Sequence, residues 1–191
     1  MIPEHNQSGV LPPFIGSKPT VEGAMAPYKA SLLQVAQKFA INEDRIQILK
    51  GLISYRKELR KEGITFGFQW IDGSFVEKSE HILGRPPKDI DLITFSPRPE
   101  KYNDPDIWRK FFQSRLDLFD PEQSKNRYFC DAYFVDLRAH PIYLVNQTKY
   151  WFGLFSHQRA TFLWKGILEL SLDEDDIEAS AFLDTGGAYG K

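Results

Sequence analysis

The sequence contains only one cysteine, Cys130, and therefore cannot form a disulfide within the chain. It also lacks an apolar run close to the roughly 18 residues that suggest a membrane-spanning helix. Its first residues have neither the basic segment nor the apolar stretch of a secretory signal peptide. These absences exclude a disulfide-stabilised fold and argue against a membrane partner, so we expect a cytoplasmic protein.

An excess of positive charge is absent as well, because 24 Lys and Arg residues face 26 Asp and Glu residues. Proteins that bind long nucleic acids usually present a strongly basic face, since phosphate neutralisation supplies most of their affinity. Apolar material is plentiful, at 42% hydrophobic and 14% aromatic in 191 residues. The composition predicts one domain with a sizeable core.

The hydrophobic pattern divides the chain into an arm, a domain and a tail. Residues 1–27 are rich in Pro, Gly and Ser and predict an extended N-terminal arm. Residues 28–172 carry the periodic segments, and the acidic, Gly-containing tail over 173–191 is expected to be mobile. The expected elements are helices over 28–39, 43–61 (capped by Asn42) and 106–118, a partly helical segment over 151–164, and strands over 65–71, 89–95, 128–137 and 165–172. This order predicts a mixed α+β domain.

Two carboxylates lie at the start of the second predicted strand. Asp89 and Asp91 are two residues apart, so on a strand they share one face while Ile90 points into the core. Neighbouring carboxylates repel each other, and a divalent cation that prefers oxygen ligands is their natural partner. We therefore predict a Mg²⁺ (or Mn²⁺) site at Asp89 and Asp91.

A glycine turn follows the preceding predicted strand. Gly73 permits the positive φ and the close backbone approach that a phosphate-binding turn needs. Ser74 can cap the next helix, whose free N–H groups favour a triphosphate. Arg159 and Lys165 are the best downstream supply of positive charge for it, although surface charge explains them equally well. The predicted nucleotide-binding residues are Gly73, Ser74, Arg159 and Lys165.

The third predicted strand offers a further acid. Asp131 and Asp136 lie on opposite faces of it, and we favour Asp131 because it is nearer the middle of the strand. Three carboxylates can hold two metal ions about 3.5–4 Å apart. Asp72 is interpreted as a turn former and Glu77 as a surface residue, and neither is predicted to be catalytic. The predicted catalytic and metal-binding residues are Asp89, Asp91 and Asp131.

The Gly-Ser turn after one strand and the Asp-x-Asp motif on the next resemble the nucleotidyltransferase superfamily. This superfamily includes DNA polymerase β, poly(A) polymerases and the small MNT-type antitoxins. Segments 9–13, 67–77 and 89–91 are similar to an uncharacterised bacterial family of nucleotidyltransferase-like proteins, over nearly the whole chain. The resemblance implies a polymerase-β-like core, with a small mixed sheet flanked by helices. The loop over 75–88 is slightly longer than is usual in the superfamily.

The resemblance also implies an activity, the transfer of a nucleoside monophosphate from an NTP such as ATP to an acceptor hydroxyl on RNA, protein or a small molecule. Its likeness to toxin–antitoxin and phage-defence (antiviral) families suggests that an operon-encoded partner supplies the acceptor. Two alternatives remain open. One is a non-catalytic regulatory partner with the same fold, and the other is a glycosyltransferase that uses Asp-Ile-Asp to bind a sugar nucleotide.

Overall fold

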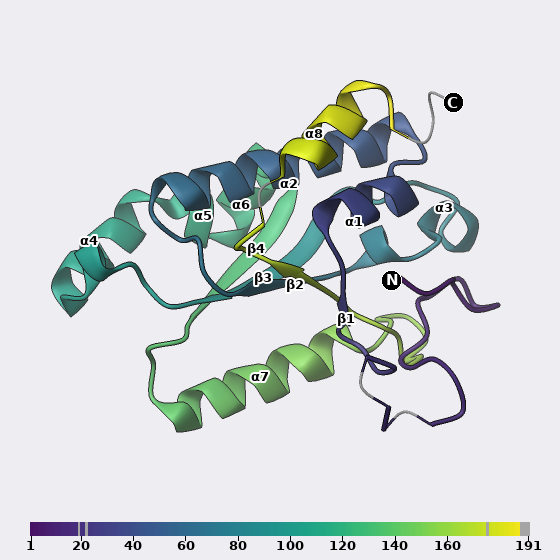
Figure 1. Cartoon of the computed structure of the whole chain (residues 1–191), viewed down its shortest axis with the longest axis horizontal. Helices are drawn as coiled ribbons and strands as arrows, with labels where there is room; N and C mark the ends of the chain where they lie inside the picture. Colours follow the sequence, from purple (N-terminus) through teal and green to yellow (C-terminus); the bar gives the residue numbers. More distant parts are fainter. Residues whose placement is uncertain (19, 22, 175, 188–191) are drawn as a thin grey trace.

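The computed structural model describes residues 1–18, 20–21, 23–174 and 176–187, and these form one five-stranded sheet with helices on both faces (Figure 1). The α-helices are α1 (Leu32–Phe39), α2 (Glu43–Lys61), α3 (Ser79–Ile82), α4 (Pro105–Ser114), α5 (Leu116–Phe119), α6 (Pro121–Tyr128), α7 (Pro141–Phe155) and α8 (Ile177–Asp184). The 3-10 helices are η1 (Ser74–Val76) and η2 (Glu100–Tyr102). The strands are β1 (Tyr28–Lys29), β2 (Phe68–Asp72), β3 (Ile90–Ser96), β4 (Cys130–Asp136) and β5 (Leu168–Ser171). The predicted α+β class with a small mixed sheet is confirmed.

The strand order in the sheet is β1-β5-β2-β3-β4. β1 and β5 are parallel, as are β3 and β4, whereas β2 is antiparallel to both of its neighbours. The C-terminal end of β2 therefore lies beside the N-terminal ends of β3 and β4. Chain reversal thus brings the segments around residues 72, 91 and 131 to one end of the sheet.

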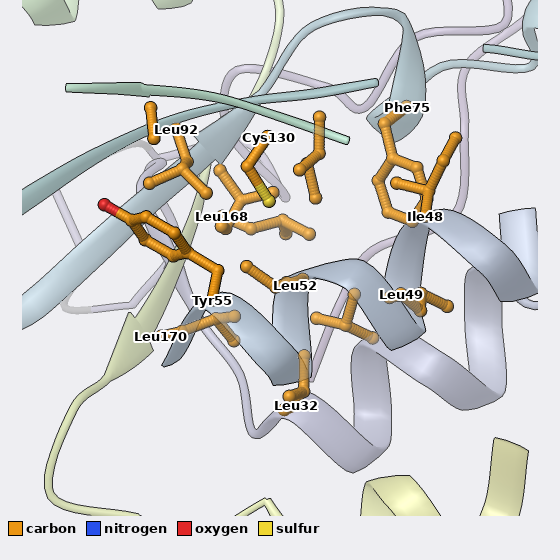
Figure 2. Close-up of a cluster of buried hydrophobic side chains, with 14 of the residues drawn as sticks. Leu32, Ile48, Leu49, Leu52, Tyr55, Phe75, Leu92, Cys130, Leu168 and Leu170 are labelled. Atoms are coloured by element: carbon orange, nitrogen blue, oxygen red, sulfur yellow. The ribbon is translucent and has the colours of Figure 1, made fainter. Parts of the chain in front are cut away.

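The two faces of the sheet are covered unequally. Figure 1 shows α1, α2 and α8 stacked over one face and α7 alone across the other. The larger core lies under α1 and α2, where alternate strand residues meet the apolar faces of these helices (Figure 2). A smaller apolar cluster lies under α7 and is largely aromatic, with Trp70, Phe95, Trp151 and Phe155 among its buried members. No helix in the described ranges is long and apolar enough to cross a membrane.

The first two helices begin where their capping residues place them. Ser31 and Gln34 form a capping box, so α1 starts at Leu32 and not at residue 28 as predicted. Residues 28 and 29 instead pair with β5 as a short strand. The side chain of Asn42 accepts a hydrogen bond from the amide of Arg45, which confirms it as the N-cap of α2.

Three later predicted elements are present but have different boundaries. The range 106–118 is helical as expected but is divided at Arg115 between α4 and the short α5, and the unpredicted helix α6 follows. The segment 151–164 is partly helical as expected, because α7 ends at Phe155, but this helix begins ten residues earlier, at Pro141. The third strand accordingly starts at Cys130, because Tyr128 belongs to α6 and Phe129 turns the chain with a φ of 57°.

The expectation of a mobile tail after residue 172 is also wrong for the described part of it. Helix α8 buries Ala179 and Leu183 against the domain. Just before α8, Asp176 accepts two hydrogen bonds from Nε of Arg56, at 3.1 and 2.9 Å, and both side chains are buried. A buried, hydrogen-bonded ion pair fixes this segment against α2, because neither charge can be left without the other.

The described part of the N-terminal arm contacts the domain through main-chain hydrogen bonds. The carbonyl of Leu11 accepts from the amide of Gly166 at 2.8 Å, and the carbonyl of Gly9 accepts from Lys78 at 2.8 Å. Leu11 itself is fully buried. The arm therefore supports both the segment that enters β5 and the start of α3.

Candidate functional site

Three carboxylates lie in one row across three neighbouring strands. Asp72 is the register partner of Asp91 in the β2–β3 pair, and Asp91 is the register partner of Asp131 in the β3–β4 pair. Register partners on adjacent strands point to the same face of a sheet. The sequence predicted that Asp91 and Asp131 would align, whereas Asp72 was not expected to join them.

The face that carries these acids is the one covered by α7. Behind the row of carboxylates come two apolar rows, Trp70–Ile93–Tyr133 and Phe68–Phe95–Val135, in the same registers. The ring centroids of Tyr133 and Trp151 are 4.5 Å apart, so α7 packs directly onto the first of these rows. The carboxylates thus stand at the edge of an apolar layer, where water is partly excluded and charge is costly.

Burial raises the pKa of two of the acids, Asp91 and Asp72. Desolvation raises the pKa of Asp91 to about 6, and repulsion from Asp89 and Asp131 contributes in the same direction. Burial likewise raises the pKa of Asp72 to about 7, although Lys165 opposes the shift. The carboxylate of Asp91 makes no hydrogen bond or ion pair with any residue that the structure describes. The charges of Lys165 and Lys125 lower the pKa of Asp91, but neither lysine contacts its carboxylate directly in the part of the chain that the structure describes.

Gly73 forms the turn directly beside Asp91. Its φ is +82°, and a Cβ at this position would lie 2.5 Å from Oδ2 of Asp91. Only glycine fits both the backbone conformation and the space. The predicted capping role of Ser74 is wrong, since its side chain caps no helix and the segment that follows Gly73 is the short 3-10 helix η1.

Lys165 lies behind this turn in a buried ionic cluster. Its Nζ is 3.0 Å from Oδ2 of Asp72 and 2.8 Å from Oε1 of Glu77, and its side chain is 3% exposed. Gln158 completes the cluster by donating to Oε2 of Glu77 at 2.9 Å. The interpretation of Glu77 as a surface residue is therefore wrong. Lys165 does reach the site, but it is enclosed by carboxylates and is not available to a phosphate.

Lys125, on α6, is the cation that reaches the open side of the carboxylates. Its Nζ is 2.5 Å from Oδ2 of Asp89 and 3.8 Å from Oδ2 of Asp131. The hydrogen bond from Lys125 to Asp89 raises the pKa of the ammonium. Sequence reasoning missed this residue because α6 was not predicted. The N-cap Asp120 followed by Pro121 at the first helical position is the signal that could have found the helix.

Two other candidates lie apart from this cluster. Arg159 is exposed on the loop after α7 and pairs with no carboxylate in the described ranges. Asp136 is on the opposite face of β4, where Nε of Arg98 lies 3.0 Å from its Oδ2. This contact is an ion pair without the alignment of a hydrogen bond. Asp136 also accepts from the amides of Arg98 and Arg138, so its oxygens are already in use.

The residues present fit a hard divalent cation, although they are not arranged as a finished cage. Within the described ranges, no three His, Cys, Asp or Glu side chains already have the arrangement of a metal site. Oδ1 of Asp131 and Oδ1 of Asp72 are nevertheless buried and have no hydrogen-bond donor there. Carboxylate oxygens are the ligands that Mg²⁺ and Mn²⁺ prefer. A cation held by Asp89, Asp91 and Asp131 would satisfy groups that the protein leaves unpaired.

The comparisons with known proteins give one match. The chain matches the model of the family described as Family of unknown function (DUF6932) over residues 3–171. No curated protein and no solved structure matches the chain. The matched segment contains every residue of the candidate site, from Asp72 to Lys165. Because it covers well over half of the 191 residues, the chain belongs to the DUF6932 family.

Proposed function

We propose that this chain is a metal-dependent nucleotidyltransferase, which transfers a nucleoside monophosphate from an NTP to an acceptor hydroxyl on RNA, protein or a small molecule. The observation that carries the proposal is the strand register that places Asp91 beside Asp131, where the Asp91 carboxylate pairs with no other residue that the structure describes. Buried carboxylates with raised pKa values are costly to keep. Such clusters occur preferentially at functional sites, and a cation relieves their cost.

The side chains have distinct roles in this proposal. Asp89, Asp91 and Asp131 supply the oxygen ligands. The bound Mg²⁺ or Mn²⁺ supplies charge neutralisation for the phosphates and polarisation of the α-phosphoryl group. Gly73 leaves room for the Asp91 carboxylate and would present main chain instead of a side chain to the nucleotide. Lys165 holds the turn in place through Asp72.

The reaction itself is an in-line displacement. The acceptor oxygen forms a bond to the α-phosphorus, and the bond from that phosphorus to the oxygen bridging to the β-phosphate breaks. Pyrophosphate leaves with the electron pair of the broken bond, and the hydroxyl proton is lost to water. The chain contributes mainly by positioning the reactants and by stabilising charge. Loss of one of the metal-binding carboxylates should therefore reduce the reaction rate severely.

One observation favours a different function, a metal-binding regulatory partner without catalysis. Two of the residues expected to contact phosphate have other surroundings, since Ser74 caps no helix and Lys165 is enclosed by Asp72 and Glu77. Arg159 lies on an exposed loop and forms no ion pair with the residues that the structure describes. A protein that only binds needs fewer contacts to the transferring phosphate than an enzyme does.

The direct test incubates purified protein with each α-labelled NTP, Mn²⁺ or Mg²⁺, and a cell extract that supplies acceptors. The double variant Asp89→Ala/Asp91→Ala removes two proposed ligands. A matched control, Asp106→Ala/Asp184→Ala, removes two carboxylates whose side chains are 75% and 70% exposed.

Label that reaches RNA, protein or a small molecule with the wild type and the control, but not with the double variant, supports transfer. Thermal stabilisation by Mn²⁺ that depends on Asp89 and Asp91, without label from any NTP, supports the regulatory alternative instead. If neither label nor stabilisation appears, the metal-site proposal is wrong.

A further inference from the structure

The two lysines at the candidate metal site differ in how firmly they are held. The side chain of Lys165 is 3% exposed and lies between two buried carboxylates, whereas that of Lys125 is 46% exposed. Moving Lys165 would leave Asp72 and Glu77 buried without a counter-charge. The flexible side chain of Lys125 can rotate so that its ammonium group points into solvent. Of these two lysines, Lys125 is therefore the one that can be released.

The base of the Lys125 side chain is fixed by the way α6 meets β4. The hydroxyl of Ser124 donates to the carbonyl of Cys130 at 2.7 Å and accepts from the amide of Ala132. The helix ends immediately afterwards, where the amide of Phe129 donates to the carbonyl of Lys125 at 2.9 Å and Phe129 adopts a φ of 57°. This short connection keeps the backbone of Lys125 close to the start of β4. A movement of the Lys125 ammonium would therefore come from its side chain and not from the helix.

The ammonium of Lys125 occupies the space between two of the proposed metal ligands. It is 2.5 Å from Oδ2 of Asp89, which precedes β3, and 3.8 Å from Oδ2 of Asp131, which is in β4. A lysine ammonium is a compact, hydrated point charge, and this is the kind of group that can take the place of an inorganic cation. Asp91, next to both acids, receives no such contact from any residue in the described ranges.

We propose that Lys125 is an internal counter-ion of the metal site. Its ammonium pairs with Asp89 and Asp131 in the metal-free protein and is displaced into solvent when a divalent cation binds. This inference rests on the part of the proposed function in which these carboxylates bind metal, and it requires no transfer activity. It implies that the apparent affinity of these carboxylates for the divalent cation is lower than their intrinsic affinity, because the Lys125 ammonium competes for them.

The first test measures Mn²⁺ affinity by titration with detection of free Mn²⁺ by electron paramagnetic resonance. Lys125→Met keeps an unbranched side chain but removes the competing charge, and we expect it to bind Mn²⁺ roughly two- to fivefold more tightly, as the strength of partly exposed ion pairs predicts. Lys110→Met is the matched control, because Lys110 is exposed on α4 and forms no ion pair in the described ranges. This control should bind like the wild type. Asp91→Ala should lose the binding.

A second test reports displacement itself in the unaltered protein. The rate of acetylation of each lysine by acetic anhydride is followed by peptide mass spectrometry, with and without saturating Mn²⁺. Release from Asp89 should make Lys125 react faster when Mn²⁺ is present, while Lys110 should show no change. In the Asp91→Ala variant, Mn²⁺ should not alter the rate at Lys125.

The outcomes separate this inference from the proposal on which it rests. Weaker or unchanged Mn²⁺ binding by Lys125→Met, or an unchanged labelling rate at Lys125, overturns the counter-ion role even if Asp91→Ala abolishes binding. Mn²⁺ binding that is absent from the wild type, or equal in the wild type and Asp91→Ala, overturns both the counter-ion role and the metal site.

Discussion

The carboxylate of Asp91 fills the space into which a side chain at residue 73 would point. A Cβ built on Gly73 would lie 2.5 Å from Oδ2 of Asp91 and 2.8 Å from its Cγ. Contacts this short do not occur in folded proteins, so one of the two residues must move if Gly73 is replaced. The glycine and the acid therefore depend on each other, although Gly73 follows β2 and Asp91 is in β3.

Gly73→Ala should weaken Mn²⁺ binding by roughly tenfold or more, the range seen when groups that orient metal ligands are altered. Part of its effect on stability will come from the φ of +82°, which alanine tolerates poorly. Gly84→Ala is the control for that part, because Gly84 has a φ of +66° and open space around its Cβ position. Equal Mn²⁺ affinity in the two alanine variants would argue against the dependence of Asp91 on Gly73.

Asp91→Asn should change the pH dependence of stability of the metal-free protein. Because the folded-state pKa of Asp91 is raised to about 6, its protonated form contributes stability that is present below the unfolded-state pKa of about 3.9 and is lost as the pH rises through 6. The wild type should therefore lose about 2 kcal/mol relative to Asp91→Asn between pH 4 and pH 7.5. Urea unfolding of both proteins at the two pH values measures this difference, and a difference that is constant with pH would count against the raised pKa.

Mn²⁺ should reverse this order of stability. At pH 7.5, the metal-free Asp91→Asn protein is expected to be more stable than the metal-free wild type. Saturating Mn²⁺ should stabilise only the wild type, because it binds the folded carboxylates and not the amide. A thermal unfolding series with and without Mn²⁺ tests the expectation directly.

Lys165→Met should destabilise the protein by about 3–5 kcal/mol, since it leaves Asp72 and Glu77 buried without their counter-charge. Adding Glu77→Gln to this variant should restore part of the loss, because one of the two unpaired charges is removed. Lys149→Met, at an exposed position on α7, should change stability by less than about 0.5 kcal/mol. Urea unfolding gives all three values. A loss below about 1 kcal/mol for Lys165→Met would show that the cluster is more hydrated than the structure indicates.

The variants Asp131→Asn and Asp136→Asn should show which acid of β4 binds the metal ion. Asp131→Asn is expected to lower Mn²⁺ affinity by more than about tenfold, because it removes a proposed ligand. Asp136→Asn should leave Mn²⁺ affinity unchanged and reduce stability, since Asp136 pairs with Arg98 on the other face of the strand. The reverse pattern would assign the third ligand to Asp136.

The alternation of side chains along strands made the acid row partly predictable. Asp91 and Ile90 could be assigned to opposite faces from their positions alone, and the structure buries Ile90 in the larger core. The pairing of β3 with β4 then determines that Asp131, and not Asp136, stands beside Asp91. Register depends on contacts between distant segments, and a single sequence does not contain that information in a local pattern.

The errors have two physical causes. Helix α7 has no clear apolar face, because Ile142, Val145 and Tyr150 are exposed on it while Trp151 and Phe155 are buried, so the periodicity that identifies helices is weak. The roles of Lys165 and Lys125 depend on which carboxylates they meet, and those partners come from other parts of the chain. Local sequence shows that a lysine is present, but tertiary packing decides whether it is enclosed or releasable.

The ion pair between Arg56 and Asp176 extends the folding unit beyond the segment that the family model matches. That segment ends at residue 171, whereas Asp176 follows it and meets Arg56 in the interior. Nη1 of Arg56 also donates to Gln69 of β2 at 2.7 Å, so the guanidinium stands between α2 and the sheet. A truncated protein that stopped at Ser171 would retain this buried guanidinium and lose its carboxylate. For expression, transplantation or fusion of this domain, the boundary therefore belongs after α8.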